Sequence, residues 1–453
     1  MLTKKTQTNM LSGPITSCLI RLTIPIMIMN VMQNLFNTID LTVLGKLVND
    51  SAVGSVGACG YLITLCTSLL IGVSVGANVV VAKHIGAKNT EQAEKSMGTA
   101  VLFSIVGGIV LAVVGFIFAQ TFLTWMNCPE TLLKGAVTYL RIYFIGIPII
   151  MLYNFCAALL RAKGDTKRPM YFLLLGGAVK VLANIFFVTV FNMTVEGVAI
   201  ATILSNGIAG GLCLYCLIKS EGSVRFRVQY LRFYFSELKQ ILFVGVPAGL
   251  EQAMYSIANV IISATVNSFG EAATTGISIA NQFDGIMFQI CVAPSLALIP
   301  YVSQNIGAKN IKRAKQAILR TMFITVGFGA TLGALSAIFS GELSSLMSTS
   351  PEVIMYSKQK MMLISSTYFL CGIDRSMSGT MRGLGRPLIP TWSTLVWMCL
   401  FRFVWIYAIF PFCPQSLTFL YLVWPVGWVL SSITQLIFFF PTTRKLQKQI
   451  QAT

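Results

Sequence analysis

Long apolar segments alternate with short polar ones along the whole chain. A helix needs roughly 20 mostly apolar residues to cross a hydrocarbon core about 30 Å thick. Twelve segments satisfy this requirement, near residues 15–38, 51–79, 96–120, 134–159, 170–191, 196–218, 240–264, 274–300, 318–340, 357–381, 388–410 and 416–440. The pattern therefore predicts an all-α polytopic membrane protein with twelve transmembrane helices. The first is expected to be retained, since no small-residue cleavage site follows it.

The composition agrees with a surface that faces lipid. Of the 453 residues, 55% are hydrophobic and only 11% are charged, and the mean hydropathy is +0.76. A soluble domain carries about 25% charged residues. The 11 cysteines are scattered, and Cys213 and Cys216 are interpreted as small apolar core residues rather than a redox or metal pair. No metal site and no cofactor are predicted.

The basic residues fall on alternate sides of the predicted helices. With a cytoplasmic N-terminus, the inside segments hold 24 Lys and Arg residues, Lys4 and Lys5 among them, and the outside loops hold four. Because positive residues concentrate on the cytoplasmic side, we predict a multi-pass protein of the cell inner membrane with both termini cytoplasmic. The net charge of +18 lies in short loops beside lipid headgroups, so the lipid bilayer, and no nucleic acid, is the expected partner.

An internal repeat is the most specific signal in the chain. Ile85-Gly86-Ala87-Lys88-Asn89 follows the second predicted span, and Ile306-Gly307-Ala308-Lys309-Asn310 follows the eighth, 221 residues later. Further matches at offsets of 221 or 222 residues are Arg161 with Arg382, Gly164 with Gly385, Pro25 with Pro247 and Asn37 with Asn259.

The offset encloses six predicted spans, so both copies cross the membrane in the same direction. They are therefore expected to be parallel six-helix repeats with a cavity between two lobes near the midplane, and to work by alternating access. The predicted domains are an N-lobe (1–218), a cytoplasmic linker (219–239) and a C-lobe (240–453).

Four of the 15 acidic residues lie inside predicted spans. A charge at a helix centre costs at least about 2.5–3.5 kcal/mol, so it should face a cavity or a partner. Asp40 shares a helix face with Asn37, and Asn37 shares one with Gln33. A carboxylate with carboxamide neighbours could bind Na⁺ or hold a proton, while the alternative is an aspartate that caps a loop at the outer interface.

The other three acids are Glu251, which Gln252 follows, Asp284 and Asp374. Each could line a substrate cavity or pair with another helix, and Lys180, Arg375 and Arg402 are the available intramembrane bases. None of the four acids has an acidic counterpart in the other repeat, where Asp40 corresponds to Ile262. The lobes are thus expected to share a scaffold but not their chemistry. Gly72 and Gly76 form a small-xxx-small motif, which is typical of close helix packing.

The chain resembles the multidrug and toxic compound extrusion (MATE) family over its whole length. The segments that support the resemblance are Gly13-Pro14-Ile15, Ile24-Pro25-Ile26, the stretch from Asn37 to Asp40, Gly76-Ala77 to Ile85-Gly86-Ala87, Arg161-Ala162-Lys163-Gly164-Asp165-Thr166 and Gly197-Val198-Ala199-Ile200-Ala201-Thr202. The resemblance implies two six-helix lobes in a V shape that export organic cations in exchange for H⁺ or Na⁺.

The resemblance also implies a coupling-ion site in the N-lobe. Asp40 matches the first-helix aspartate, Asn184 the fifth-helix asparagine, Thr202 the sixth-helix threonine and Tyr139 a fourth-helix tyrosine. The second aspartate of several members is Val188 here, which favours H⁺ over Na⁺. In the C-lobe, Glu251 matches the seventh-helix acid of some bacterial branches, whereas the spacing of Asp374 departs from the pattern.

The predicted function is a secondary antiporter that exports small cationic organic molecules or drugs, working as a monomer. The first alternative is a flippase for lipid-linked oligosaccharides, whose anionic substrate would suit Arg375, Arg402 and Lys180. A membrane-embedded transferase is a weaker alternative, because the only histidine, His84, lies in a basic loop without a nucleophile motif or metal-ligand spacing. A channel or receptor is equally weak.

Overall fold

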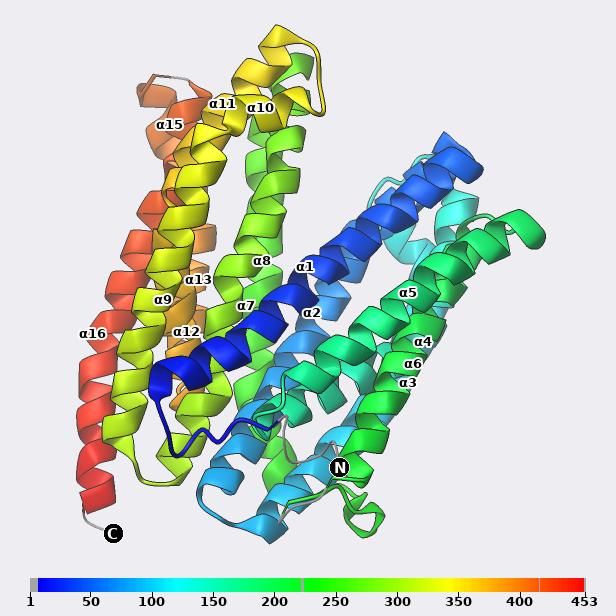
Figure 1. Ribbon diagram of the computed structural model, residues 1–453. Coiled ribbons are helices and arrows are strands. Elements are labelled where there is room, and N and C mark those ends of the chain that lie inside the picture. The colour runs from blue at the N-terminus through cyan, green and yellow to red at the C-terminus, as the bar shows by residue number, and fades with distance from the viewer. Residues whose placement is uncertain (1–6, 221–223, 415, 452–453) are drawn as a thin grey trace. The chain divides into compact units, whose positions relative to one another are not determined.

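The computed structural model describes residues 7–220, 224–414 and 416–451, and these residues form helices and connecting loops without a strand. Lys4, Lys5 and residues 221–223 of the predicted linker lie outside the described residues. In the first half, the helices are α1 (Ile15–Leu47), α2 (Asp50–Gly86), α3 (Thr90–Trp125), α4 (Glu130–Ala162), α5 (Lys167–Val190), α6 (Val195–Ile218) and the short η1 (Val228–Tyr230) (Figure 1).

The second half continues with further long helices and several short ones. They are α7 (Phe235–Asn267), α8 (Glu271–Gly307), α9 (Ile311–Ile338), α10 (Ser340–Ser345), α11 (Pro351–Ser366), α12 (Tyr368–Gly383), α13 (Leu388–Thr394), η2 (Leu395–Leu400), α14 (Phe401–Val404), η3 (Trp405–Ile409), η4 (Phe410–Phe412), α15 (Leu417–Tyr421) and α16 (Val423–Gln451). Segments α13 to η4 follow one another directly and form one candidate span, Leu388–Phe412.

Eleven helices in the described part are long and apolar enough to cross a membrane. The tenth predicted span, 357–381, is the exception. There the chain forms α11 and α12, two 16-residue helices separated only by Thr367, and both are rich in polar residues. The prediction of an all-α membrane fold is confirmed, and α11 and α12 occupy the tenth predicted span.

The chain divides into two compact units. One comprises residues 28–246 together with residues 7 and 8, and the other comprises residues 9–27 and the chain from residue 247 onward. Both divisions lie inside long helices, α1 and α7, at or just after Pro25 and Pro247. Proline removes a backbone donor and commonly kinks a helix, and both divisions lie within one turn of a proline.

The repeated motifs adopt the same local structure in both units. Lys88 (φ 57°) and Lys309 (φ 59°) both lie in the left-handed region at the end of a long helix. The next residues, Asn89 and Asn310, then begin α3 and α9, because each side chain accepts a hydrogen bond from the backbone amide three residues later. Identical turn chemistry at corresponding helix junctions confirms the duplication.

A second pair of junctions agrees. Gly164 (φ 83°) and Gly385 (φ 76°) both adopt a left-handed conformation that disfavours other residues. Their amides donate to the carbonyls of Arg161 and Arg382, at 2.9 Å in each case. The α4–α5 and α12–α13 turns are therefore copies of one another.

Small residues bring helices close together in the first unit. A Cβ atom on Gly76 would lie 2.1 Å from the carbonyl oxygen of Ile241 and 2.8 Å from the amide nitrogen of Gly245. A Cβ atom on Gly245 would lie 2.5 Å from the Cα atom of Val73. The small-xxx-small motif thus packs α2 against α7, as its sequence predicts.

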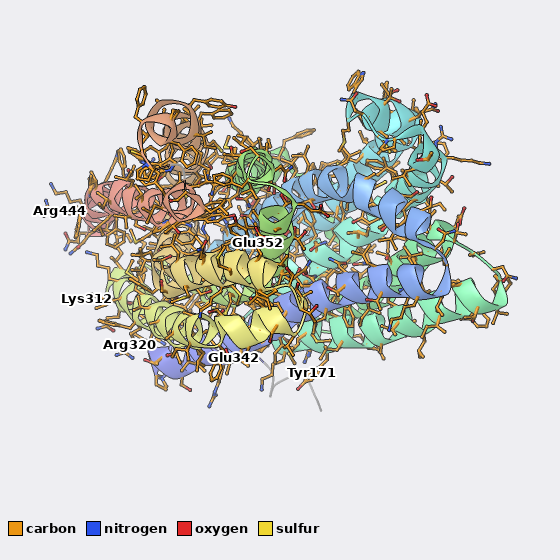
Figure 2. All side chains as sticks on the ribbon, turned by 90° about the horizontal axis from the view of Figure 1, so that it is seen from above. Tyr171, Lys312, Arg320, Glu342, Glu352 and Arg444 are labelled. Carbon is orange, nitrogen blue, oxygen red and sulfur yellow. The ribbon has the colours of Figure 1, made fainter. Side chains whose placement is uncertain are left out.

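Aromatic side chains dominate the core of the second unit. Tyr255, Tyr368, Trp405 and Trp428 are buried there, and the Trp428 indole donates to the Tyr255 hydroxyl at 2.6 Å. Some charged groups of this unit lie at its margin: the exposed Lys312 and Arg320 come from the first part of α9, and Arg444 comes from the end of α16 (Figure 2).

Candidate ion and substrate sites

In the first unit, Asp40 is buried against α5. Its two carboxylate oxygens have different partners, since Lys180 Nζ lies 2.6 Å from Oδ2 and Asn184 Nδ2 donates to Oδ1 at 2.7 Å. Lys180 and Asn184 are four residues apart, so one face of α5 presents both groups to α1. Asp40 is therefore an ion-paired, hydrogen-bonded carboxylate rather than an exposed loop cap.

The structure brings only some of the predicted site residues to Asp40. Tyr139 is buried on α4 and lies near enough to interact electrostatically with the carboxylate. Thr202 uses its hydroxyl to bond the carbonyl of Val198 in its own helix, at 2.9 Å. Asn37 and Gln33 are exposed on α1. The Asp40 cluster thus consists of groups from α1, α4 and α5.

The chemistry of this cluster follows from the neighbouring ammonium group. Lys180 already supplies the positive charge that a buried carboxylate needs. A metal cation at Asp40 would be repelled by that ammonium, whereas a proton adds no bulk and simply neutralises the carboxylate. Asn184 Oδ1 is also buried without a partner in the described part of the chain. It is an unused acceptor within a few ångströms of the acid.

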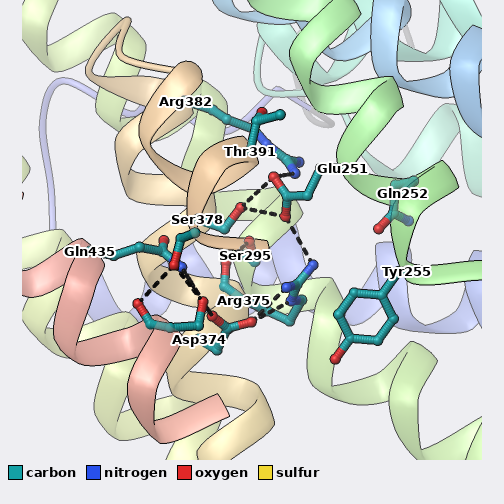
Figure 3. A network of polar contacts seen from close by, with 12 residues as sticks. Glu251, Gln252, Tyr255, Ser295, Asp374, Arg375, Ser378, Arg382, Thr391 and Gln435 are labelled. Atoms are coloured by element: carbon teal, nitrogen blue, oxygen red, sulfur yellow. Dashed lines mark hydrogen bonds and ion pairs between the residues drawn. The ribbon is translucent and has the colours of Figure 1, made fainter. Parts of the chain in front are cut away.

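In the second unit, Glu251 on α7 is fully buried beside α12. Its Oε2 atom lies 2.6 Å from Arg382 Nη2, its Oε1 atom lies 3.0 Å from Arg375 Nη1, and Ser378 donates to Oε1 at 3.0 Å (Figure 3). The three partners occupy one side of α12, at intervals of three and four residues. Gln252, the next residue on α7, is half-buried outside this network.

Asp374 extends the network toward α16. It lies 2.5 Å from Arg375 Nη2, and its other oxygen accepts hydrogen bonds from Ser431 at 2.5 Å and Gln435 at 3.0 Å. Arg375 therefore bridges Asp374 and Glu251 (Figure 3). The two acids and the two arginines, Arg375 and Arg382, balance in charge within a fully buried cluster.

Asp284 on α8 is paired as well. Lys360 Nζ lies 2.8 Å from its Oδ2 atom and also contacts Asn281. The backbone carbonyl of Asp284 accepts a hydrogen bond from Tyr368 at 3.1 Å. All three acids predicted for the C-lobe are therefore ion-paired in this structure.

The sequence identified these acids but not all of their partners. Arg382 and Lys360, which pair with Glu251 and Asp284, are both buried in helices. The tenth helical segment begins at Pro351 rather than near residue 357. Pro351 directly after Ser350 is a helix-start signal that could have placed it correctly.

Taken together, long apolar helices, a duplicated six-helix scaffold and buried acid–base clusters define a multi-pass transporter of small molecules. The chain belongs to the MatE family, whose profile matches residues 25–186 and 247–408. These two regions coincide with the repeats seen in the turns and motifs. The family consists of transporters rather than enzymes.

Relatives of known description agree with this assignment. The chain is 28% identical to "Probable multidrug resistance protein YoeA" of Bacillus subtilis, covering 81% of each chain. It is 26% identical to "FAD transporter" of Shewanella oneidensis, covering 85% of this chain and 86% of the relative. Its fold matches that of a solved structure described as the outward-facing conformation of a multidrug resistance MATE family transporter, with a TM-score of 0.90, 20% identity and full coverage of both chains.

Proposed function

We propose that this protein exports small organic molecules, organic cations and drugs among them, in exchange for H⁺ by alternating access. The observation that supports this proposal is the buried contact of Asp40 with Lys180 and Asn184. We further infer that it works as a monomer in the cell inner membrane with both termini cytoplasmic. The excess of basic residues in one set of loops supports that orientation.

The proposed coupling step is proton exchange at Asp40. Protonation removes the carboxylate charge and leaves the Lys180 ammonium without its counter-ion in a buried place. An unpaired buried charge costs several kcal/mol, so the protonated state favours a conformation in which Lys180 reaches water. The pH gradient drives this change, since each pH unit is worth about 1.4 kcal/mol per proton.

A cationic substrate would compete with Lys180 for the Asp40 carboxylate. It could bind Asp40 only by displacing the Lys180 ammonium, so cation, proton and lysine compete for one carboxylate. This competition links substrate release to proton binding. Na⁺ is the less favoured coupling ion, because it must gather several oxygen ligands beside an ammonium that lies 2.6 Å from the carboxylate.

The test is ethidium transport in proteoliposomes with an imposed pH gradient, an imposed Na⁺ gradient, or neither. Wild type should transport ethidium under the pH gradient alone. Asp40→Asn should reduce that transport at least tenfold. Transport by Asp40→Asn at the wild-type rate, or transport that depends on Na⁺ alone, would contradict the proposal.

A double variant separates a coupling role from a structural ion pair. Asp40→Asn combined with Lys180→Met removes both charges, so it should fold and remain monodisperse, yet stay inactive. If the pair only stabilises the fold, the double variant should transport like wild type. The matched control is Asp284→Asn with Lys360→Met, which neutralises a comparable buried pair in the second unit and should retain its response to the pH gradient.

A further inference from the structure

Arg402 is a fully buried cation without a carboxylate partner. It lies on α14 in the middle of the candidate span Leu388–Phe412, and its exposed fraction is 0%. Its Nη1 donates to the side-chain oxygen of Asn259 at 2.8 Å. Its Nε and Nη2 atoms have no hydrogen-bond partner among the described residues. Buried guanidinium donors normally bind an acceptor, because an unsatisfied one forfeits its whole solvation.

The charges of the second unit make Arg402 exceptional. Among the Lys and Arg residues buried in its described part, Lys360 has Asp284, while Arg375 and Arg382 share Glu251 and Asp374. Arg402 is the one left without an acid. Arginine does not lose its proton in proteins, so the interior of this unit retains one uncompensated positive charge.

The internal repeat identifies what is missing. The two family-matched regions start at residues 25 and 247 and end at residues 186 and 408, an offset of 222 that pairs Lys180 with Arg402 and Asp40 with Ile262. The offset is 221 at Gly164 and Gly385. The π-helical segment η2 lies between Gly385 and Arg402 and accounts for the extra residue.

The equivalent base therefore has different partners in the two units. In the first unit, Lys180 contacts the acid of the first helix, Asp40. In the second unit, Arg402 reaches the corresponding helix at Asn259, but Ile262 occupies the place of the acid and is buried. The base is kept, whereas an isoleucine occupies the position of its anionic partner.

The surroundings of Arg402 indicate the shape of the missing anion. Its guanidinium lies over the rings of Trp424, at 4.8 Å, and Tyr255, at 5.6 Å. These two rings contact the guanidinium, and the unpartnered Nε and Nη2 atoms form one of its edges. That edge matches two oxygens of a carboxylate or phosphate. Of the residues that contact Arg402, Asn259 is exposed and Trp424 is half-buried, whereas the Nε and Nη2 atoms themselves are buried.

We propose that Arg402 is an anion-binding residue whose Nε–Nη2 edge binds the carboxylate or phosphate group of a small organic molecule. This inference rests on the proposed function in one respect, which is that the bound molecule is taken to be a transported one. The two flanking rings favour a ligand with a planar aromatic part next to its anionic group. Arg402 thereby selects for an anionic group, as the Asp40 cluster selects for positive charge.

The first experiment compares riboflavin with flavin mononucleotide, two probes that differ by one phosphate group. Inorganic phosphate and benzoate serve as additional anionic probes. Binding to the purified protein is measured by the melting midpoint and by quenching of tryptophan fluorescence. Flavin mononucleotide should bind at least tenfold more tightly than riboflavin, and Arg402→Gln should abolish the difference. Equal binding of both flavins, an unchanged preference in Arg402→Gln, or no response to any anionic probe would overturn the proposal.

A second experiment supplies the anion from within the chain and does not depend on the choice of probe. Ile262→Asp places a carboxylate where the first repeat has Asp40. In the Arg402 background it should be tolerated, with a melting midpoint within a few degrees of wild type, and should abolish flavin mononucleotide binding. In the Arg402→Gln background the same aspartate should be strongly destabilising. Equal destabilisation in both backgrounds would show that Arg402 is already satisfied, for example by buried water.

The last measurement distinguishes the source of the anion. The melting midpoints are compared in nanodiscs of phosphatidylcholine and of phosphatidylglycerol. The proposal expects the flavin mononucleotide preference in both lipids. If stabilisation comes only from phosphatidylglycerol and is lost in Arg402→Gln, the anion is a lipid headgroup and the proposed small-molecule ligand is wrong. These binding measurements use no ion gradient, so they can be interpreted even if the antiport test fails. The antiport test can likewise be interpreted if the binding measurements fail.

Discussion

The buried network around Glu251 leads to a prediction about charge balance. In wild type, Glu251 and Asp374 compensate Arg375 and Arg382, with contacts of 2.5–3.0 Å. Glu251→Gln removes one negative charge and leaves Arg382, whose side chain is only 9% exposed, without a carboxylate. Breaking one partner of a buried pair costs about 3–5 kcal/mol, so the variant should be strongly destabilised, with a much lower melting midpoint.

The reverse change should be similarly harmful for the opposite reason. Arg382→Met leaves two carboxylates to share Arg375. Combining Glu251→Gln with Arg382→Met restores a balanced Arg375–Asp374 pair, and apolar replacement of a whole buried pair is often neutral. The double variant should therefore recover most of the loss, which corresponds to a coupling free energy of about 3 kcal/mol or more, at the top of the usual range.

The assay is the melting midpoint of detergent-purified protein, followed by the fraction that stays monodisperse after heating. Wild type and the double variant should have similar midpoints, and both single variants should be clearly lower. Ser378→Ala is the matched control, because it deletes a hydrogen bond to the same carboxylate without changing the charge balance, and it should cost less, about 1.5–3 kcal/mol. A double variant as unstable as the worse single variant would refute the charge-balance reasoning.

Two further predictions concern the backbone of the first unit and use the same melting assay. Gly76→Ala places a Cβ atom 2.1 Å from the carbonyl oxygen of Ile241, so α2 and α7 must separate at a cost of about 1–3 kcal/mol. Gly57→Ala is the control in the same helix, because its Cβ atom meets nothing within 4 Å and the change should be neutral or stabilising. Equal effects of the two substitutions would contradict the packing of α2 on α7. Lys88→Gly should stabilise by about 1 kcal/mol because Lys88 has a φ of 57°, while Lys88→Ala keeps that strain and should not.

The fold could be predicted from the sequence because its signals are local. Length and hydropathy mark membrane-crossing helices, and the short motif ending in Lys88-Asn89 recurs with the same turn and the same helix cap in Lys309-Asn310. The tenth segment was less well predicted because α11 and α12 carry Lys360, Asp374 and Arg375. Such charges lower the mean hydropathy of a segment and so obscure its ends, although their partners lie inside the unit.

The sites were harder to predict because their contacts are long-range. The sequence marks Asp40, Glu251, Asp284 and Asp374 as costly groups that need a partner. It does not show which base meets which acid, because that depends on how each helix is rotated about its axis. Asp40 and Lys180 are 140 residues apart in the chain and are joined only by the packing of α1 on α5.

The two buried bases at equivalent positions have consequences for what can be moved against the membrane potential. Lys180 faces an acid that can take up a proton, so its cluster changes charge during the proposed cycle. Arg402 has no acid and keeps its charge. Exchange of a cation for a proton moves no net charge, whereas exchange of an organic anion for a proton moves two. At about 2.3 kcal/mol per charge per 100 mV, a ligand bound through Arg402 would draw on the potential far more strongly than one bound at Asp40. The loss of one acid between the repeats, from Asp40 to Ile262, thus bears on the energetics of transport as well as on ligand choice.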